Sequence, residues 1–155
     1  MNRPGVIEQI LCPVDFSESS LEAAGDVVDL AQKLKAHVIF LHVVNEAFLE
    51  DLERLGGRLE FYEGAAEKAM KSLTRQRREK LENLLAEKEA GRVSYESLVQ
   101  VGIPWECILD TVEKLNIDMI LMGAKGRGSL VRHLRFGSSA EKVFRRANCR
   151  VMFVR

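Results

Sequence analysis

Two short segments near the C-terminal end of the chain hold the residue types best suited to binding phosphate. Gly123-Ala124-Lys125-Gly126 follows the apolar run 118–122, and Gly137-Ser138-Ser139 opens an amphipathic run after a spacer of ten residues. Small residues between a strand and a helix leave backbone N–H groups uncovered, and a helix N-terminus adds a positive dipole end. We therefore predict a phosphate site here, with ordinary turn glycines as the alternative.

A carboxylate follows another apolar run, in the segment Pro13-Val14-Asp15-Phe16-Ser17. Ligands of open parallel sheets bind beyond the carboxyl ends of the strands, where the strand order reverses. If the runs ending near Asp15 and Gly123 are neighbouring strands, both ends face one crevice. Asp15 could then accept a hydrogen bond from a ribose hydroxyl or an adenine amine. The alternative is that Asp15 only helps to cap the following helix.

Other chemistry finds less support in the sequence. The spacer is basic, and one or two of its cations could pair with phosphate, although a solvated loop is the commoner explanation. These residues are Lys125, Arg127, Arg132, His133 and Arg135. His133 has no partner at metal-ligand spacing, so no metal site is expected. His37 and His42 lie in or beside an apolar run and are expected to be packed core histidines. No catalytic motif is evident, so no catalytic residue is assigned.

Composition predicts one globular domain spanning residues 1–155, with 46% apolar and 30% charged residues. Because 23 basic residues balance 23 acidic ones, no global field attracts nucleic acid, and any anion site must be local. No apolar run approaches membrane-spanning length. Cys12, Cys107 and Cys149 show no metal or redox spacing. They are expected to be plain thiols, with redox sensing as the alternative, and a reducing cytoplasm fits this pattern.

Hydrophobic periodicity predicts strands alternating with helices, which favours right-handed crossovers and a parallel sheet. The expected strands are 6–14, 36–44, 93–101, 117–122 and 150–154, with the third nearer an edge. Four expected helices are 21–34 with Ser17 as N-cap, 65–89, one opened by Pro104, and one that presents Ala140, Val143, Phe144 and Ala147 to the core. A further short helix is expected within 45–64, broken at Gly56-Gly57.

Together these segments resemble the universal stress protein family along nearly the whole chain. The resemblance rests on segments 10–19, 41–44, 101–104, 118–123 and 137–143, and on a Gly-x-x-Gly-spacer-Gly-Ser pattern whose spacer is one residue longer here. It implies an α/β fold, Rossmann-like and similar to the adenine nucleotide α-hydrolases. The implied sheet is open, parallel and five-stranded, in the order 3-2-1-4-5, with helices on both faces. It also implies a homodimer, which we expect to form through the C-terminal strand 150–154.

The family's ATP-binding branch keeps the glycines and implies a set of nucleotide-binding residues here. Positions matching the adenosine contacts are Pro13, Val14, Asp15 and Val43, those lining ribose and phosphates are Met122, Gly123 and Gly126, and those binding phosphate are Gly137, Ser138 and Ser139. The implied function is an ATP-binding cytoplasmic regulator of the stress response, with slow, Mg²⁺-assisted hydrolysis at most. The first alternative is a protein-interaction module whose pocket is empty or holds another adenosine compound. The second is an enzyme of the wider α-hydrolase group.

Overall fold

The fold is that of a computed structural model, which describes residues 5–56, 64–125 and 136–155. Its strands are β1 (Gln9–Pro13), β2 (His37–Asn45), β3 (Tyr95–Gly102), β4 (Met119–Gly123) and β5 (Arg150–Val154). Its α-helices are α1 (Glu18–Leu34), α2 (Ala47–Gly56), α3 (Ala65–Glu87), α4 (Pro104–Lys114) and α5 (Ser138–Arg146). The predicted elements are thus confirmed with small shifts of their ends, and α2 is the short helix expected within 45–64.

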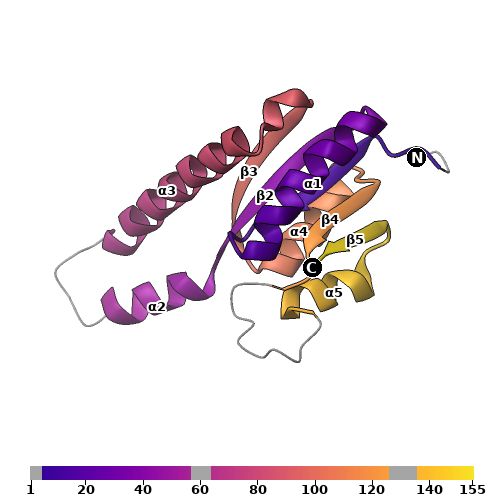
Figure 1. The fold of residues 1–155 in the computed structure, drawn as a ribbon. Coiled ribbons are helices and arrows are strands. Elements are labelled where there is room, and N and C mark those ends of the chain that lie inside the picture. Colours follow the sequence, from indigo (N-terminus) through magenta and orange to yellow (C-terminus); the bar gives the residue numbers. More distant parts are fainter. Residues whose placement is uncertain (1–4, 57–63, 126–135) are drawn as a thin grey trace.

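The five strands form one parallel sheet in the order β3-β2-β1-β4-β5 (Figure 1). Leu11 at the centre of β1 lies opposite Ile39 of β2 on one side and Ile120 of β4 on the other. The order of the strands reverses at β1, since β2 and β3 extend to one side and β4 and β5 to the other. The predicted strand order is confirmed, and the ends of β1 and β4 are neighbours as the sequence suggested.

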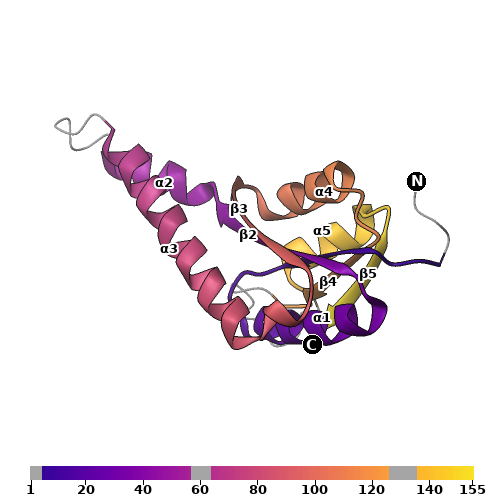
Figure 2. The ribbon, with the colours of Figure 1, turned by 90° about the horizontal axis from the view of Figure 1, so that it is seen from above.

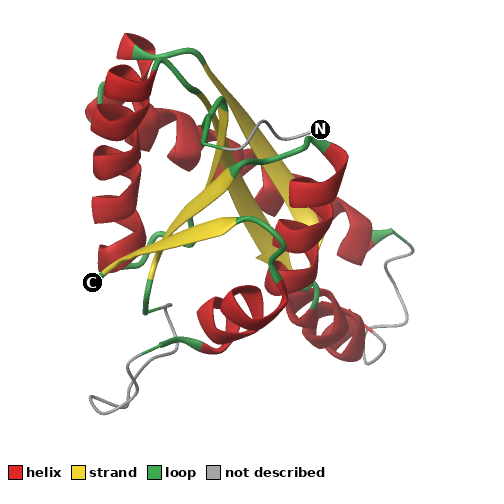
Figure 3. Cartoon of the chain, turned by 90° about the vertical axis from the view of Figure 1, so that its right-hand side faces the viewer, coloured by secondary structure: helices red, strands yellow, loops and turns green. Residues whose placement is uncertain are grey.

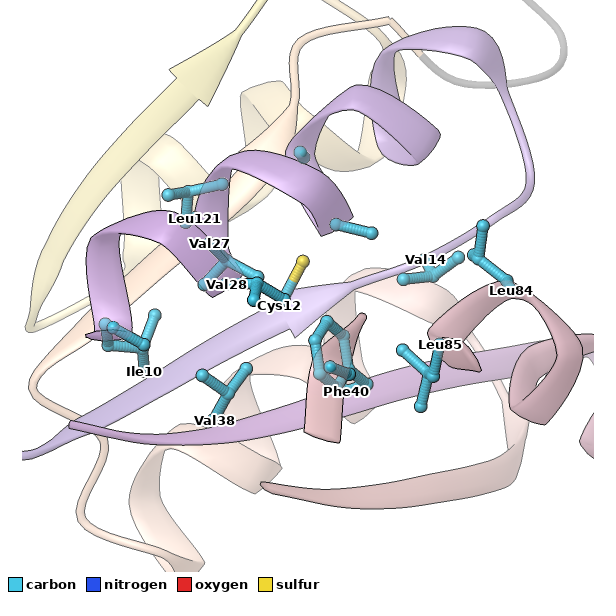
Figure 4. Close-up of a cluster of buried hydrophobic side chains, with 14 of the residues drawn as sticks. Ile10, Cys12, Val14, Val27, Val28, Val38, Phe40, Leu84, Leu85 and Leu121 are labelled. Atoms are coloured by element: carbon cyan, nitrogen blue, oxygen red, sulfur yellow. The ribbon is translucent and has the colours of Figure 1, made fainter. Parts of the chain in front are cut away.

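Helices cover both faces of the sheet (Figures 2 and 3). On one face, α1 and α3 pack onto apolar side chains of the central strands, among them Cys12 and Phe40 (Figure 4). On the other face, Ile108 of α4 and Val143 of α5 pack against Leu11 and its neighbours. Because both faces are covered, the central strands are almost continuously apolar, which is typical of parallel sheets.

The helix ends follow local sequence signals. Ser17 is the N-cap of α1, and its side chain accepts a hydrogen bond from the N–H of Ser20, as predicted. Pro104 occupies the first turn of α4, where its missing N–H costs no hydrogen bond. The described α2 helix and the start of α3 project together beyond the edge of the sheet (Figures 1 and 2).

One core assignment from the sequence is wrong. Phe144 was expected on the buried face of the last helix, but it is 64% exposed. Ala140 and Val143 fill the buried face of α5 instead. Phe144 lies near the sheet edge at β5, where its ring is 6.2 Å from that of Phe153 and 6.4 Å from that of Phe136. Periodicity places a residue on a face of its helix, but it does not reveal where the sheet beneath that helix ends.

Candidate functional site

A cavity of about 550 Å³ opens beyond the carboxyl ends of β1, β2 and β4. Its size lies within the usual range of small-molecule sites, which is roughly 300–1,000 Å³. The predicted site residues in its lining are Pro13, Val14, Asp15, Val43, Met122, Gly123, Gly137, Ser138 and Ser139. The tenth predicted residue, Gly126, lies outside the described residues, as does almost all of the ten-residue spacer. The structure therefore brings together every predicted site residue that it describes.

The turn after β1 fixes the carboxylate of Asp15. The backbone N–H of Ser17 donates to Asp15 Oδ1 at 2.9 Å, and the Ser17 hydroxyl donates to the same oxygen. Between them Phe16 adopts a left-handed conformation with φ of 63°, which is uncommon for a bulky residue. Asp15 thus orders the turn through Ser17, and it also lines the cavity. The structural role of Asp15 in this turn is thus observed, and its role in binding a ligand stays a prediction.

The end of β4 is tied to the start of α1. A Cβ at Gly123 would lie 2.7 Å from the carbonyl carbon of Ser19 and 2.8 Å from the backbone nitrogen of Ser20, closer than real contacts allow. The Ser19 hydroxyl also donates to the carbonyl oxygen of Lys125 at 2.6 Å. This close approach requires glycine at position 123, and it sets the two turns that follow β1 and β4 side by side.

The N-terminus of α5 forms another wall of the cavity. Its N-cap is Gly137, and within the described part of the chain no side chain caps the helix. The N–H of Gly137 donates to the carbonyl of Ala124 at 2.7 Å, which holds the start of the helix beside the end of β4. The first N–H groups of a helix lack intrahelical partners, and the dipole favours an anion there. Ser138 and Ser139 add hydroxyl groups, so this end can bind phosphate.

Of the two histidines expected in the core, His42 is packed there, whereas His37 is half-buried and hydrogen-bonds the Ser94 hydroxyl through Nδ1 at 2.7 Å. His42 is only 4% exposed, and its Nδ1 hydrogen-bonds the carbonyl oxygen of Val14 at 2.7 Å. Its ring centroid lies 4.8 Å from that of Phe16. His42 also lines the cavity. It therefore holds the end of β1 to β2 and forms part of the cavity wall at the same time.

Several cavity residues were missed by the sequence reasoning. They are Phe48 of α2, Leu73 and Arg77 of α3, and Pro104 and Ile108 of α4. Arg77 had a signal in the sequence, because it stands between Leu73 and Leu81 at four-residue spacing on the apolar stripe of its helix. Of the basic residues singled out around the spacer, Lys125 lines the cavity, and the other four lie outside the described residues.

The cysteines show little of the chemistry that redox sensing needs. Burial, followed by the charge of Asp26, raises the pKa of the Cys12 thiol far above its usual range. Burial is also the largest cause of the raised pKa values of Cys107 and Cys149. Because the thiolate is the reactive form, a raised pKa disfavours redox chemistry. These features favour plain thiols over redox sensors.

Among the described residues, no cluster of three or more histidine, cysteine or acidic side chains could hold a metal ion. Over the same residues, no helix has the length and apolar character needed to cross a membrane.

Comparisons with known proteins agree with the fold and show the family. The model of the Universal stress protein family matches residues 7–155. Universal stress protein MJ0577 of Methanocaldococcus jannaschii is 32% identical over 155 residues, covering 96% of this chain and 94% of that protein. The solved structure of MJ0577 superposes with a TM-score of 0.79 at 28% identity, covering 96% of both chains. The universal stress protein from Archaeoglobus fulgidus in complex with dAMP has the same fold, with a TM-score of 0.59 at 17% identity, covering 96% of this chain and 98% of that one.

Proposed function

Because the chain belongs to the universal stress protein family, we propose that it is a single-domain protein that binds an adenine nucleotide, ATP in the first place. The site is the cavity beyond the carboxyl ends of β1 and β4. The observation that supports this most directly is that all the described residues of the predicted set line this one cavity, beside a helix N-terminus without a side-chain cap. A protein of the same fold is known in complex with dAMP.

In this proposal the nucleoside and the phosphates occupy different parts of the cavity. Asp15 and Val43, with Pro13 and Val14, contact the adenosine part. Met122, Gly123 and Gly126 line the ribose and the phosphates. The backbone N–H groups at the start of α5 and the hydroxyls of Ser138 and Ser139 bind phosphate.

The site supports slow ATP hydrolysis at most. Phosphoryl transfer requires neutralisation of charge, usually by Mg²⁺, and a positioned water molecule. The groups present for this are the Asp15 carboxylate and the hydroxyls of Ser138 and Ser139. They suit a protein that holds its nucleotide as a signal. We therefore propose a cytoplasmic regulator of the stress response whose protein partner reads nucleotide occupancy.

Two measurements test nucleotide binding. The purified protein is denatured and the released small molecules are identified by mass spectrometry, and the nucleotide-free protein is titrated with ATP and Mg²⁺ by calorimetry. We expect a released adenine nucleotide, or saturable binding of one mole of ATP per chain. If no nucleotide is released and ATP does not bind, the result supports the alternative function, a protein-interaction module that uses the same fold without ATP. A different released adenosine compound would keep the site but replace the ligand.

We also propose a homodimer joined through β5. This strand is the last of the sheet, and edge strands present N–H and C=O groups to another chain. Beside it lie the stacked and tilted rings of Phe136, Phe144 and Phe153. Met152 on β5 is 45% exposed and Phe144 on α5 is 64% exposed. Two strands related by a two-fold axis can pair antiparallel and bury this apolar surface in each other.

Light scattering on the intact chain at micromolar concentration tests the dimer. Val151 and Phe153 pack partly on the protein's own core, so the exposed Met152 and Phe144 are better positions for charge. We expect the double variant Met152→Asp, Phe144→Asp to be a folded monomer. Leu34→Asp, at an exposed site at the end of α1, should remain dimeric. A monomeric parent protein would contradict the proposal, and a dimer that survives the double substitution would place the contact elsewhere.

A further inference from the structure

One arginine lies on the side of α3 that packs against the sheet. Leu81, Leu84 and Leu85 of this helix are buried in the core, and Leu73 lines the cavity four residues before Arg77. Arg77 continues this stripe into the cavity lining. Its immediate neighbour Arg78 is exposed. Arg77 is half-buried, and an anionic or aromatic partner stabilises a cation that loses part of its hydration.

The aromatic partner at hand is Phe16, but another cation is closer to it. Lys80 Nζ lies 4.4 Å from the centroid of the Phe16 ring, whereas Arg77 Cζ lies 6.0 Å from it, at the limit of a cation–π contact. In residues 5–56, 64–125 and 136–155, no carboxylate forms an ion pair with Arg77. Arg77 therefore lines the cavity without an ion-pair partner among the described residues.

Phe16 also fixes where in the cavity Arg77 lies. It directly follows Asp15 in the chain, and its ring lies against His42 of β2. Arg77 is thus on the side of the cavity formed by Asp15 and β2. The N-terminus of α5 lies elsewhere, because α3 runs beside β2 and β3 whereas α5 lies beside β5 (Figures 1 and 2).

The cavity consequently has two separate positive regions. One is the start of α5, and the other is Arg77 on α3. Lys125 also lines the cavity, and its backbone is tied to the α1 turn, because its carbonyl oxygen accepts hydrogen bonds from Ser17 and Ser19. In the proposed function, the 5′-phosphates of the nucleotide occupy the first region and the nucleoside lies at Asp15. Adenine and unmodified ribose carry no charge, so such a nucleotide leaves Arg77 without an anion. A phosphate on a ribose hydroxyl would supply one on the Asp15 side.

We propose that Arg77 forms a second anion subsite, so that an adenosine nucleotide with a phosphomonoester on the ribose binds more tightly than the same nucleotide without it. This inference rests on the proposed function, because it requires the nucleoside at Asp15. A planar guanidinium donates two parallel hydrogen bonds to a phosphate, which gives both strength and geometric selection. The cavity of about 550 Å³ has room for a nucleotide with one further phosphate.

Calorimetry with three compounds tests the subsite. The probes are AMP, adenosine 3′,5′-bisphosphate and adenosine 2′,5′-bisphosphate, which differ only in the ribose phosphate. We expect one bisphosphate to bind about tenfold more tightly than AMP, since charge-assisted hydrogen bonds are among the strong ones. The compound that gains affinity identifies the ribose position that Arg77 reads.

Variants on α3 assign the gain to its residue. Arg77→Met should lose the bisphosphate preference to within about twofold, measured as the ratio of bisphosphate to AMP affinity in the same variant, and Arg77→Lys should retain part of it. Arg78→Met is the matched control on the same helix and should keep the full preference. Melting temperatures confirm that each variant is folded.

The outcomes separate this inference from the proposed function. AMP binding without any bisphosphate preference would overturn the subsite and leave the nucleotide site intact. A preference that survives Arg77→Met would overturn the role of Arg77 and point to Lys125. If no compound binds, the proposed function and the subsite are both wrong.

Discussion

The helices α1 and α5 both begin at the cavity, but their N-termini are satisfied in different ways. Ser17 caps α1 with its side chain, and that serine is itself held by Asp15. Gly137 begins α5 without a side-chain cap among the described residues. An N-terminus with its own cap has fewer N–H groups to offer, whereas an uncapped one can take its acceptor from a ligand.

This difference separates the structural role of one N-terminus from the binding role that we propose for the other. The α1 turn uses its polar side chains to build and orient the site, including the tie from Ser19 to Lys125. The α5 turn has no side-chain cap among the described residues, and in our proposal its backbone N–H groups bind the anion. Variants of the α1 turn should therefore change both the free energy of unfolding and the affinity for ATP, whereas variants of the α5 turn should change mainly the affinity.

The largest effect is expected where the two turns meet. Gly123→Ala places a Cβ against the backbone of Ser19 and Ser20, which cannot move aside as a flexible side chain would. We expect a loss of about 1–3 kcal/mol of unfolding free energy, the usual cost of overpacking, together with loss of detectable ATP binding. Thermal or urea unfolding and calorimetry measure the two.

Gly91→Ala is the matched control, because nothing lies within 4 Å of a Cβ added there. Its stability should stay within about 0.5 kcal/mol of the parent. A Gly123→Ala variant as stable as Gly91→Ala, and binding ATP normally, would show that the two turns are not closely coupled.

The second effect concerns Asp15, whose carboxylate belongs to the α1 turn and also faces the cavity. Asp15→Asn keeps an oxygen that can accept from Ser17 but removes the charge. We expect ATP affinity to fall by about 1.5–3 kcal/mol, the value of a hydrogen bond to a charged group, with little change in melting temperature. A lower melting temperature with unchanged affinity would reduce Asp15 to a capping residue.

Most of the fold and most of this site could be predicted from sequence because their signals are local. Ser17 before an apolar helical pattern predicts the cap, and glycines between a strand and a helix predict the phosphate loop. The strand order came from the family resemblance, and it places the ends of β1 and β4 together. Once these ends adjoin, the residues that follow each strand must share one crevice.

The contribution of α3 could not be predicted in the same way. Its place depends on how the chain returns from β2 through the segment 46–64, and no periodicity within the helix encodes that path. Arg77 was therefore missed as a cavity residue, although it interrupts an apolar stripe. The exposed position of Phe144 was missed for a similar reason, since the sheet edge is a property of tertiary structure.

A smaller effect is expected at the cap of α1. Ser17→Ala removes the acceptor for the N–H of Ser20 and the hydroxyl donor to Asp15. Loss of an N-cap costs about 0.5–2 kcal/mol of stability. Affinity for ATP should fall less than in Asp15→Asn, because the N–H of residue 17 still donates to the Asp15 carboxylate. Unfolding curves and calorimetry on both variants show which one loses more stability and which one loses more ATP affinity.

The smallest effect is expected at the start of α5. The informative result there is whether the substitution lowers affinity for ATP or stability. Ser138 is exposed, and the helix that it begins has no side-chain cap in the described structure, so Ser138→Ala should leave the melting temperature unchanged. Affinity for ATP should drop by about 0.5–1.5 kcal/mol, the range for one neutral hydrogen bond. Compared with Ser17→Ala, this variant should show the reverse pattern: a lower affinity for ATP with an unchanged melting temperature. If Ser138→Ala instead lowers stability as Ser17→Ala does and leaves affinity intact, the α5 hydroxyl serves its own helix, and the contrast between the two N-termini fails.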